Sequence, residues 1–321
     1  MANSKQEHLQ KNQLDFPVEK GEFVRWESRF RSWITVDGSA GPSGVGGFKA
    51  ESGRYHLYVS YACPWAHRTL IYRKLKGLES HISVSVVNPK MTEISWDFAD
   101  YPGATGDTLY QSKTLQEIYD KAAGQYDGVV TVPVLWDKKK QTIVNNESSE
   151  IIRMFNSAFN DVSGNKADYY PEELRAEIDE VNRFVYDNIN NGVYKAGFAK
   201  SQKAYEKAFT QLFDALNKIE ARLAHQRYLV GDTLTEADLR LFPTLIRFDS
   251  VYVGHFKCNL KRLDDYPNLS KYLRAIYQRP GVAQTVNMDH IKHHYYWSHT
   301  AINPTRIVPK GPVVDYTQPL I

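Results

Sequence analysis

Residues 55–66 read YHLYVSYACPWA, and they join a predicted strand to a predicted helix. Residues 56–60 form a short β-prone run. A helix is predicted from about residue 64 to residue 76, because apolar and aromatic residues recur there at helical spacing and Gly77 follows as a stop signal. Cys63 therefore stands between the two elements, at the N-terminus of the helix.

A second strand turns this segment into a βαβ unit. Residues 82–87, ISVSVV, have high β propensity, and the two strands of such a unit run parallel because the helix crosses over between them. Two more strands and a closing helix are predicted over 129–136, 142–144 and 148–159. The order βαβ and then ββα is that of a thioredoxin-like domain, which we place at residues 51–160.

The chain on either side of this domain has a different character. Residues 1–50 contain aromatic residues and then a glycine-rich loop, and we expect them to be an N-terminal extension that packs on the core. Residues 161–321 show helical spacing and predict a helical bundle with an extended C-terminal tail. Within the bundle, Thr-Glu-Ala-Asp at 235–238 predicts a capping box at a helix start. The fold class is therefore α/β plus all-α.

The composition argues against several classes of function. Lys and Arg number 40 against 37 Asp and Glu, and this net charge of +3 is too mild for nucleic acid or an anionic membrane as the main partner. No apolar run approaches the roughly 18 residues of a membrane helix, and the polar residues 1–14 do not resemble a signal peptide. The 2 cysteines cannot build a disulfide framework. We therefore expect a soluble protein of the reducing cytoplasm.

Cys63 is the strongest candidate for a catalytic residue. Unpaired N–H groups and the dipole at a helix N-terminus favour the thiolate, and Pro64 suits the first helical position. The alternative is a small buried residue at an element boundary. A dithiol oxidoreductase would have its second cysteine three residues later, where this chain has Ala66. A mixed disulfide on Cys63 must then wait for an external thiol, because we interpret Cys258 as a buried structural residue.

Two residue pairs predict where a peptide-like ligand binds. Proline at Val132-Pro133 is confined to a sheet edge or a special turn. In a thioredoxin-like domain we expect this bond to be cis, with the N–H and C=O of Val132 free for a ligand backbone. Glu147-Ser148 opens the closing helix, where Ser148 and the helix N–H groups suit a carboxylate and Glu147 suits an ammonium. An edge-strand proline and a simple N-cap are the alternatives. Together the pairs predict a γ-glutamyl site.

The sequence around Cys63 resembles a known family. Residues 53–68, GRYHLYVSYACPWAHR, are similar to the signature of the glutathionyl-hydroquinone reductases, the Xi class of the Omega-like glutathione transferases. Further similar blocks occur at 95–98, 131–137, 145–150, 194–199, 247–252 and 302–305. The resemblance spans residues 23 to 312, so it bears on both halves of the chain.

The resemblance implies a reaction and its co-substrate. The substrates are glutathionyl-hydroquinones and other aromatic glutathione conjugates, and the products are hydroquinone and oxidised glutathione. Cys63 attacks the substrate's glutathione sulfur, the aromatic ring leaves, and a second glutathione releases the enzyme from the mixed disulfide. Such an enzyme serves quinone metabolism. Family members are typically dimers, so we expect a homodimer.

The resemblance also gives roles to aromatic residues that would otherwise be interpreted as core. Tyr194 matches the tyrosine that gives the leaving ring its proton, which the chemistry requires. Tyr252 and Tyr295, or Tyr296 beside it, match tyrosines that support the thiolate and line the substrate pocket. Trp96 lies in the long insertion before the third strand and is expected to cover bound glutathione.

Other interpretations compete with this one. An Omega-like thioltransferase or dehydroascorbate reductase would share Cys63 and glutathione but would not need an aromatic pocket. A non-catalytic glutathione-transferase-like scaffold would not need a thiol at a helix N-terminus. His67 lies one turn after Cys63, but we interpret it as structural. The C-terminal histidines lack the companion residues of a zinc motif, so no metal is predicted. They are His290, His293, His294 and His299.

Overall fold

The structure is a computed structural model that describes residues 17–92 and 95–320, and it divides into two compact units. The first unit consists of Trp26–Ala167, without residues 93–94, and Thr285–His299. The second unit consists of residues 17–25, Asp168–Gln284 and residues 300–320.

The first unit is built on a four-stranded mixed sheet with the order β4-β3-β5-β6. Its strands are β3 (Tyr55–Val59), β4 (Ile82–Val86), β5 (Val134–Asp137) and β6 (Thr142–Asn145). β3 and β4 are parallel, with Leu57 opposite Val84, whereas β5 is antiparallel to both β3 and β6. The predicted βαβ and ββα order of a thioredoxin-like domain is therefore confirmed.

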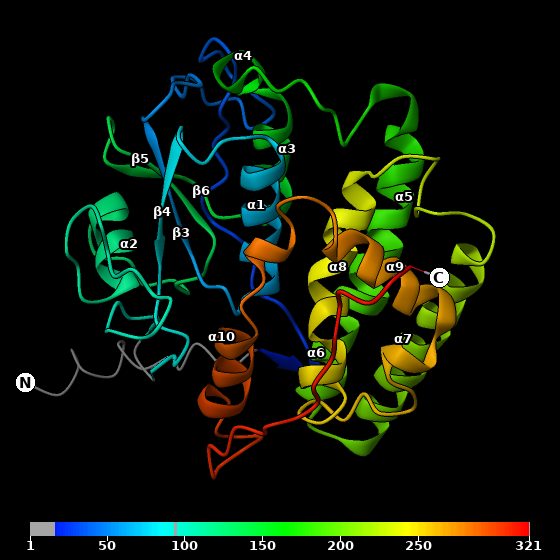
Figure 1. Cartoon of the computed structure of the whole chain (residues 1–321). Helices are drawn as coiled ribbons and strands as arrows, with labels where there is room; N and C mark the ends of the chain where they lie inside the picture. The colour runs from blue at the N-terminus through cyan, green and yellow to red at the C-terminus, as the bar shows by residue number, and fades with distance from the viewer. Residues whose placement is uncertain (1–16, 93–94, 321) are drawn as a thin grey trace, which may run out of the picture. The chain divides into compact units, whose positions relative to one another are not determined.

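Helices cover both faces of this sheet (Figure 1). α1 (Pro64–Leu75) and α3 (Ser148–Ser157) pack together on one face, and α2 (Leu115–Ala123) lies on the other. The short α4 (Asn160–Ser163) follows α3. Every residue of β3 is buried, because a central strand between two layers of helix has neither face in water.

The third strand of this sheet along the chain, β5, is shorter than the strand that the sequence predicts. The run at 129–136 predicts a longer strand, but β5 begins only at Val134, which pairs with Tyr58. Pro133 lacks the N–H that a ladder position requires. The residues before it are therefore left outside the sheet, next to the first turn of α1.

A segment from the C-terminal part of the sequence belongs to the first unit. It contains α10 (Met288–His293) and the π-helical turn η6 (His294–Ser298). His290 Nε2 lies 2.7 Å from the Pro102 carbonyl oxygen, and the Met91 N–H donates to Ser298 Oγ at 3.0 Å. These bonds join the segment to the long insertion between β4 and β5.

The second unit is a bundle of helices, as predicted. The long α7 (Gln202–Leu223) packs against α6 (Gly192–Gly197) and α9 (Pro267–Tyr277). α5 (Arg175–Val185) and α8 (Glu236–Arg247) pack together. They continue into the π-helical turns η2 (Tyr186–Asn190) and η3 (Phe248–Tyr252). The short elements of this unit are β1 (Val18–Glu19), β2 (Glu22–Phe23), η1 (Glu172–Leu174) and η4 (Leu263–Asp265). The turn η5 (Ala283–Thr285) lies where the chain passes from the second unit to the first.

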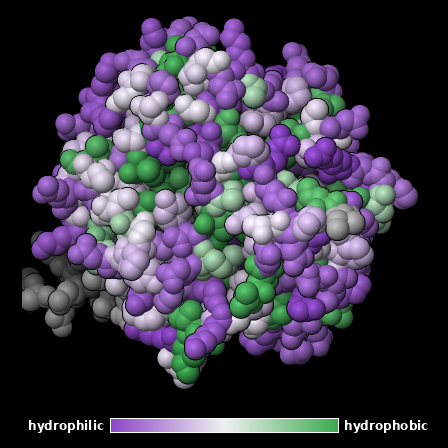
Figure 2. All heavy atoms as spheres, in the orientation of Figure 1, coloured by the Kyte–Doolittle hydropathy of each residue, from purple (hydrophilic) through white to green (hydrophobic). Residues whose placement is uncertain are grey.

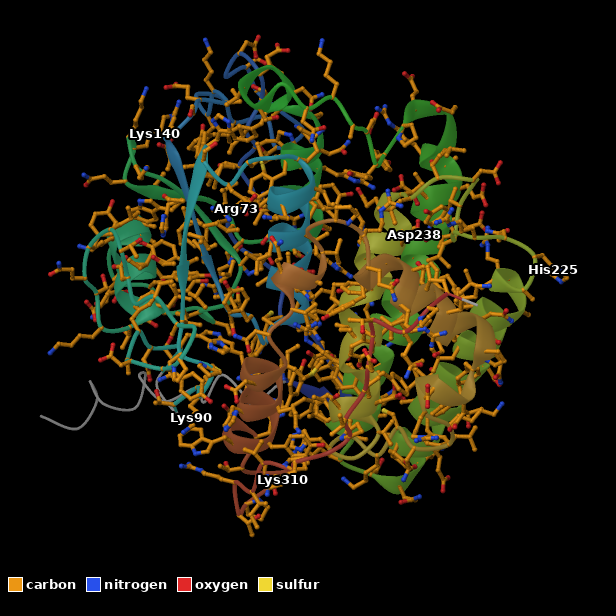
Figure 3. The ribbon with its side chains drawn as sticks, viewed as in Figure 1. Arg73, Lys90, Lys140, His225, Asp238 and Lys310 are labelled. Atoms are coloured by element: carbon orange, nitrogen blue, oxygen red, sulfur yellow. The ribbon has the colours of Figure 1, made fainter. Side chains whose placement is uncertain are left out.

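The predicted capping box at 235–238 is confirmed at the start of α8. The Asp238 carboxylate accepts hydrogen bonds from the Thr235 N–H at 2.8 Å and from the Thr235 hydroxyl at 3.1 Å. It also accepts from the Leu229 N–H and the Tyr272 hydroxyl, each at 2.8 Å. Asp238, labelled in Figure 3, is wholly buried. One carboxylate thus joins α8 to α9 and to the loop before α8.

Hydrophobic and hydrophilic residues are interspersed on the face drawn in Figure 2. Exposed large hydrophobic residues include Leu260, Ile307 and Val313, and single residues of this kind are ordinary on a protein surface. In the described part of the chain, no helix has both the length and the apolar character to cross a membrane.

Candidate active site

Cys63 lies where the sequence predicts it, at the N-cap of α1. Its backbone is extended (φ −74°, ψ 121°), with Pro64 directly after it. Its carbonyl accepts from the His67 N–H at 3.0 Å, and its own N–H donates to the Ser60 carbonyl at 3.2 Å. The partly exposed thiol donates to the Val132 carbonyl at 3.5 Å. The sulfur is thus held between a helix N-terminus and the residues that lead into β5.

The Val132-Pro133 peptide bond is cis, as predicted. The Val132 carbonyl, which the sequence predicts to be free, instead accepts the hydrogen bond from Cys63. The Val132 N–H has no hydrogen-bond partner within residues 17–92 and 95–320. A main-chain donor beside the Cys63 thiol offers a pairing position for the backbone of a bound peptide.

Glu147 caps α3 with its own side chain. One carboxylate oxygen accepts from the Ser149 N–H at 3.0 Å and from the Ser149 hydroxyl at 2.9 Å, and the other accepts from the Ser28 hydroxyl at 3.1 Å. Burial opposes the charge, but the Ser149 hydrogen bonds, the Arg68 guanidinium and Ser28 hold the pKa of Glu147 below its ordinary value. Glu147 therefore carries a negative charge at neutral pH.

Arg68 is a candidate site residue that sequence reasoning misses. Its side chain is buried, its guanidinium carbon lies 4.6 Å from the centre of the Trp65 ring, and its Nη1 donates to the Ser148 hydroxyl at 3.5 Å. A buried cation beside the start of α3 adds positive charge where a ligand carboxylate is predicted. Only its place on α1, five residues after Cys63, could have suggested it.

Trp96 lies in the long insertion and stacks on a histidine from the C-terminal segment. The rings of Trp96 and His294 are 4.7 Å apart and 24° from parallel, and Trp96 is 6% exposed. His294 Nδ1 lies 3.0 Å from the Pro89 carbonyl oxygen, at the start of the same insertion. His294 thus gives the Trp96 ring a surface to pack on, and no local sequence pattern indicates this pairing.

Tyr295 and Tyr296 follow His294 in η6 and differ in burial. Tyr295 is 1% exposed, and its ring packs edge-on against His294 and His299 at 5.3 Å from each. Tyr296 is half-buried. Both tyrosines belong to the same unit as Cys63.

Tyr194 and Tyr252 belong to the second unit, where they share one aromatic cluster. Their ring centres are 6.2 Å apart, and Phe256 packs against both at 5.4 Å. The guanidinium of Arg25, from the N-terminal extension, lies 4.8 Å from the centre of the Tyr194 ring. The structure therefore brings these two tyrosines together and adds a cation that sequence reasoning misses.

The remaining candidates have structural contacts. His67 is wholly buried, and its Nε2 lies 2.8 Å from Thr285 Oγ1. Cys258 is wholly buried in the second unit, where burial raises the pKa of its thiol. Both observations agree with the structural roles predicted for these residues. Among the residues that the structure describes, no three His, Cys, Asp or Glu side chains are grouped to hold a metal ion.

Comparisons with known proteins agree with this architecture. Residues 62–158 match the family model described as glutathione S-transferase, N-terminal domain, and residues 202–275 match that for the C-terminal domain. The chain is 60% identical over 300 residues to the glutathionyl-hydroquinone reductase YqjG of Escherichia coli K12. The matched residues cover 93% of this chain and 92% of YqjG.

Two solved structures resemble the chain over nearly its whole length. The glutathione-bound structure of YqjG, described as a glutathione transferase homolog, has a TM-score of 0.89 at 61% identity and covers 92% of this chain and 96% of that one. The glutathione-S-transferase Xi of Phanerochaete chrysosporium has a TM-score of 0.90 at 54% identity, with coverage of 95% and 98%. The chain therefore resembles these two proteins in both sequence and fold over nearly its whole length.

Proposed function

The chain belongs to the glutathionyl-hydroquinone reductases, the Xi class of glutathione transferases, and we propose that it performs this reduction through a mixed disulfide on Cys63. The observation that carries the mechanism is the position of the thiol. Cys63 is partly exposed at the N-cap of α1, and Ala66 occupies the position of a second thiol. Such a cysteine can accept glutathione from a substrate and must then be released by another glutathione.

The proposed reaction balances in two steps. The Cys63 thiolate attacks the glutathione sulfur of the substrate, so that a disulfide forms and the carbon–sulfur bond to the aromatic ring breaks. The electron pair of that bond stays with the ring carbon, which takes up a proton and becomes hydroquinone. The thiolate of a second glutathione then attacks the Cys63–glutathione disulfide. This step releases oxidised glutathione and restores the Cys63 thiolate.

We infer that residues of the first unit bind the glutathione part of the substrate. The Val132 N–H and C=O lie beside Cys63 and suit the peptide backbone. The α3 N-terminus, with Ser148 and the buried Arg68, suits the γ-glutamyl carboxylate, and the charged Glu147 suits its ammonium. Trp96 would cover the bound peptide. A solved structure of YqjG, the 61% identical relative, holds glutathione, which supports glutathione as the ligand of this chain.

Tyr194 is proposed as the proton donor. A carbon leaving group needs a proton as its bond to sulfur breaks, because a bare aryl carbanion is far too basic. Tyr252, which packs near Tyr194, and Tyr295 or Tyr296 would stabilise the thiolate and line the quinone pocket. The Xi family relationship supports these roles.

The alternatives make different predictions. An Omega-like thioltransferase or dehydroascorbate reductase would reduce small disulfides or dehydroascorbate better than aromatic conjugates, and a scaffold would do neither.

We also propose that the protein is a homodimer located in the cytoplasm, in line with the family. Sedimentation velocity measures the oligomeric state, and fractionation of cells measures the location. The domain boundaries at residues 50 and 160 likewise stay a prediction.

The substitution Tyr194→Phe tests the proposed function by separating two activities. Reduction of a disulfide releases a thiolate and needs no acid, whereas release of hydroquinone does. We expect Tyr194→Phe to lose hydroquinone release by roughly 10²–10⁴-fold and to keep most of its exchange with small glutathione disulfides. Product mass spectrometry and a disulfide assay measure the two rates.

The controls are a tyrosine elsewhere and the nucleophile itself. Tyr277→Phe changes a half-buried tyrosine that packs on Tyr316, and both activities should stay near those of the parent. Cys63→Ser should lose both. Equal losses of the two activities in Tyr194→Phe would contradict the proposal that Tyr194 is the proton donor.

A further inference from the structure

The N-terminal extension places one arginine on the ring of Tyr194. Arg25 follows β2 in the second unit, and its guanidinium carbon lies 4.8 Å from the centre of the Tyr194 ring and 5.2 Å from that of Phe23. Its Nε donates a hydrogen bond to Asn191 Oδ1 at 2.7 Å. The guanidinium is therefore oriented by a fixed acceptor as well as by two aromatic rings.

The contacts of Arg25 fix both the start of α6 and the ring that α6 carries. Asn191 is buried and immediately precedes α6, and Tyr194 lies within the same helix. Phe23 and Phe198 pack on the Tyr194 ring at 6.1 Å and 6.2 Å, with interplanar angles of 29° and 4°. Apolar walls of this kind weaken the screening of a nearby charge by water.

A cation in this position acts differently on the two protonation states of a tyrosine. The face of an aromatic ring attracts a cation. A phenolate attracts it more strongly, because the negative charge spreads from the oxygen into the ring. The titratable side chains against the Tyr194 ring include the Arg25 guanidinium and the phenol of Tyr252. Of these two, Arg25 brings a positive charge.

We propose that Arg25 is a positioning residue for the reaction, holding Tyr194 in place and favouring transfer of its proton to the leaving hydroquinone ring. This inference rests on the proposed function of Tyr194 as the acid. It gives the N-terminal extension a part in catalysis, because an element outside the thioredoxin-like domain and the bundle helices supplies the charge.

The test measures hydroquinone release against pH in Arg25→Gln and Arg25→Lys. Glutamine removes the charge while it can still donate to Asn191. We expect Arg25→Gln to slow release by roughly 3- to 30-fold and to move the alkaline limb of the profile upward by about 0.5 to 1.5 pH units. Arg25→Lys keeps the charge and should hold the limb close to that of the parent. Disulfide exchange at Cys63 should be unchanged in both variants.

Arg29→Gln is the matched control, because Arg29 also lies over a tyrosine ring, that of Tyr126 at 5.7 Å, in the first unit. It should leave the pH profile unchanged. A slower Arg25→Gln with an unmoved alkaline limb, or equal losses of both activities, would overturn the inference while Tyr194 keeps its role. If Tyr194→Phe itself keeps full hydroquinone release, Tyr194 is not the acid. This result differs from the one that would overturn the Arg25 inference alone.

Discussion

The Cys63 and Cys258 thiols differ in the two properties that control the reactivity of sulfur. Cys63 is partly exposed and stands at a helix N-terminus, where peptide dipoles favour the anion. Cys258 is wholly buried, and burial raises the pKa of its thiol because a charge in an apolar interior is costly. The thiolate is the nucleophile in disulfide exchange, so the reaction with glutathione should be confined to Cys63.

Oxidised glutathione should therefore add a single glutathione to the protein, on Cys63. Intact mass spectrometry followed by peptide mapping checks the number and the position. Cys258→Ser is the control and should take up the same single adduct. An internal disulfide between Cys63 and Cys258 would contradict the requirement for an external thiol.

The α10–η6 segment holds in place the insertion that carries Trp96. His290 and His294 lie within hydrogen-bond distance of the Pro102 and Pro89 carbonyls. Lys90, labelled in Figure 3, lies over the Trp297 ring at 5.7 Å. The insertion is thus fastened to the C-terminal segment at several points, and the stacking of Trp96 on His294 is the one nearest to the proposed glutathione cover.

Removal of that stack should weaken the binding of glutathione. His294→Ala leaves the Trp96 ring without the surface it packs on, and we expect the KM for glutathione to rise by roughly 3- to 10-fold, in line with the energy of an aromatic pair. The kcat should change less than the KM, because Cys63 and Tyr194 are unaltered and Tyr295, whose ring also packs on His294, keeps its contact with His299. His293→Ala is the control, since His293 lies on the same segment but contacts Tyr101 and Asp289. Equal KM values in the two variants would contradict a role for His294.

The capping boxes of α2 and α8 show how burial changes the stability that one motif contributes. Glu117 closes the box of α2 at the surface, where its carboxylate accepts from the Thr114 N–H at 3.1 Å. Asp238 closes the box of α8 in the interior and has donors from Leu229 and Tyr272 as well. At the surface, water can replace a lost cap. In the interior, the same loss leaves donors unpaired.

Matched alanine substitutions should reveal this difference. Glu117→Ala should cost about 0.5–1 kcal/mol of unfolding free energy, as surface caps do. Asp238→Ala should cost about 3–5 kcal/mol, because several buried donors lose their acceptor at once. Urea titration of both variants measures the two values. A loss at Asp238 no larger than that at Glu117 would show that the buried contacts contribute little.

At the scale of the whole molecule, the proposed glutathione site links binding to folding. A ligand that binds only the folded protein stabilises it by an amount set by its concentration relative to its Kd. The proposed contacts come from α1, α3, the residues before β5 and the insertion. Binding should therefore be lost when the first unit unfolds.

Glutathione should accordingly raise the unfolding midpoint. At about 100 times its Kd we expect a gain of about 2.7 kcal/mol, measured by thermal or urea unfolding. Cys63→Ser should keep this gain, because the proposed binding contacts do not require the sulfur. Trp96→Ala should lose part of it. No gain in the parent protein would contradict the proposed binding site.

Much of the fold could be predicted because its determinants are local. The thioredoxin-like order, the thiol at the start of α1 and the capping box of α8 each depend on a few neighbouring residues. Periodicity, proline and capping chemistry act over one or two turns of chain, so the sequence alone is sufficient. The cis bond at Pro133 followed from the domain once its order was recognised.

Only the tertiary structure decided which distant residues meet. The contacts of Arg68 with Ser148, of His294 with Trp96, and of Arg25 with Asn191 and Tyr194 join segments far apart in the chain. The sequence separation is 80 for Arg68 and Ser148 and 166 for Arg25 and Asn191. The entropy of closing a loop changes only slowly with its length, so chain separation does not favour one distant pairing over another. Burial and packing of the complete units make that choice, and for this reason the sequence predicted the proposed nucleophile, Cys63, but not the side chains that pack on Trp96 and Tyr194.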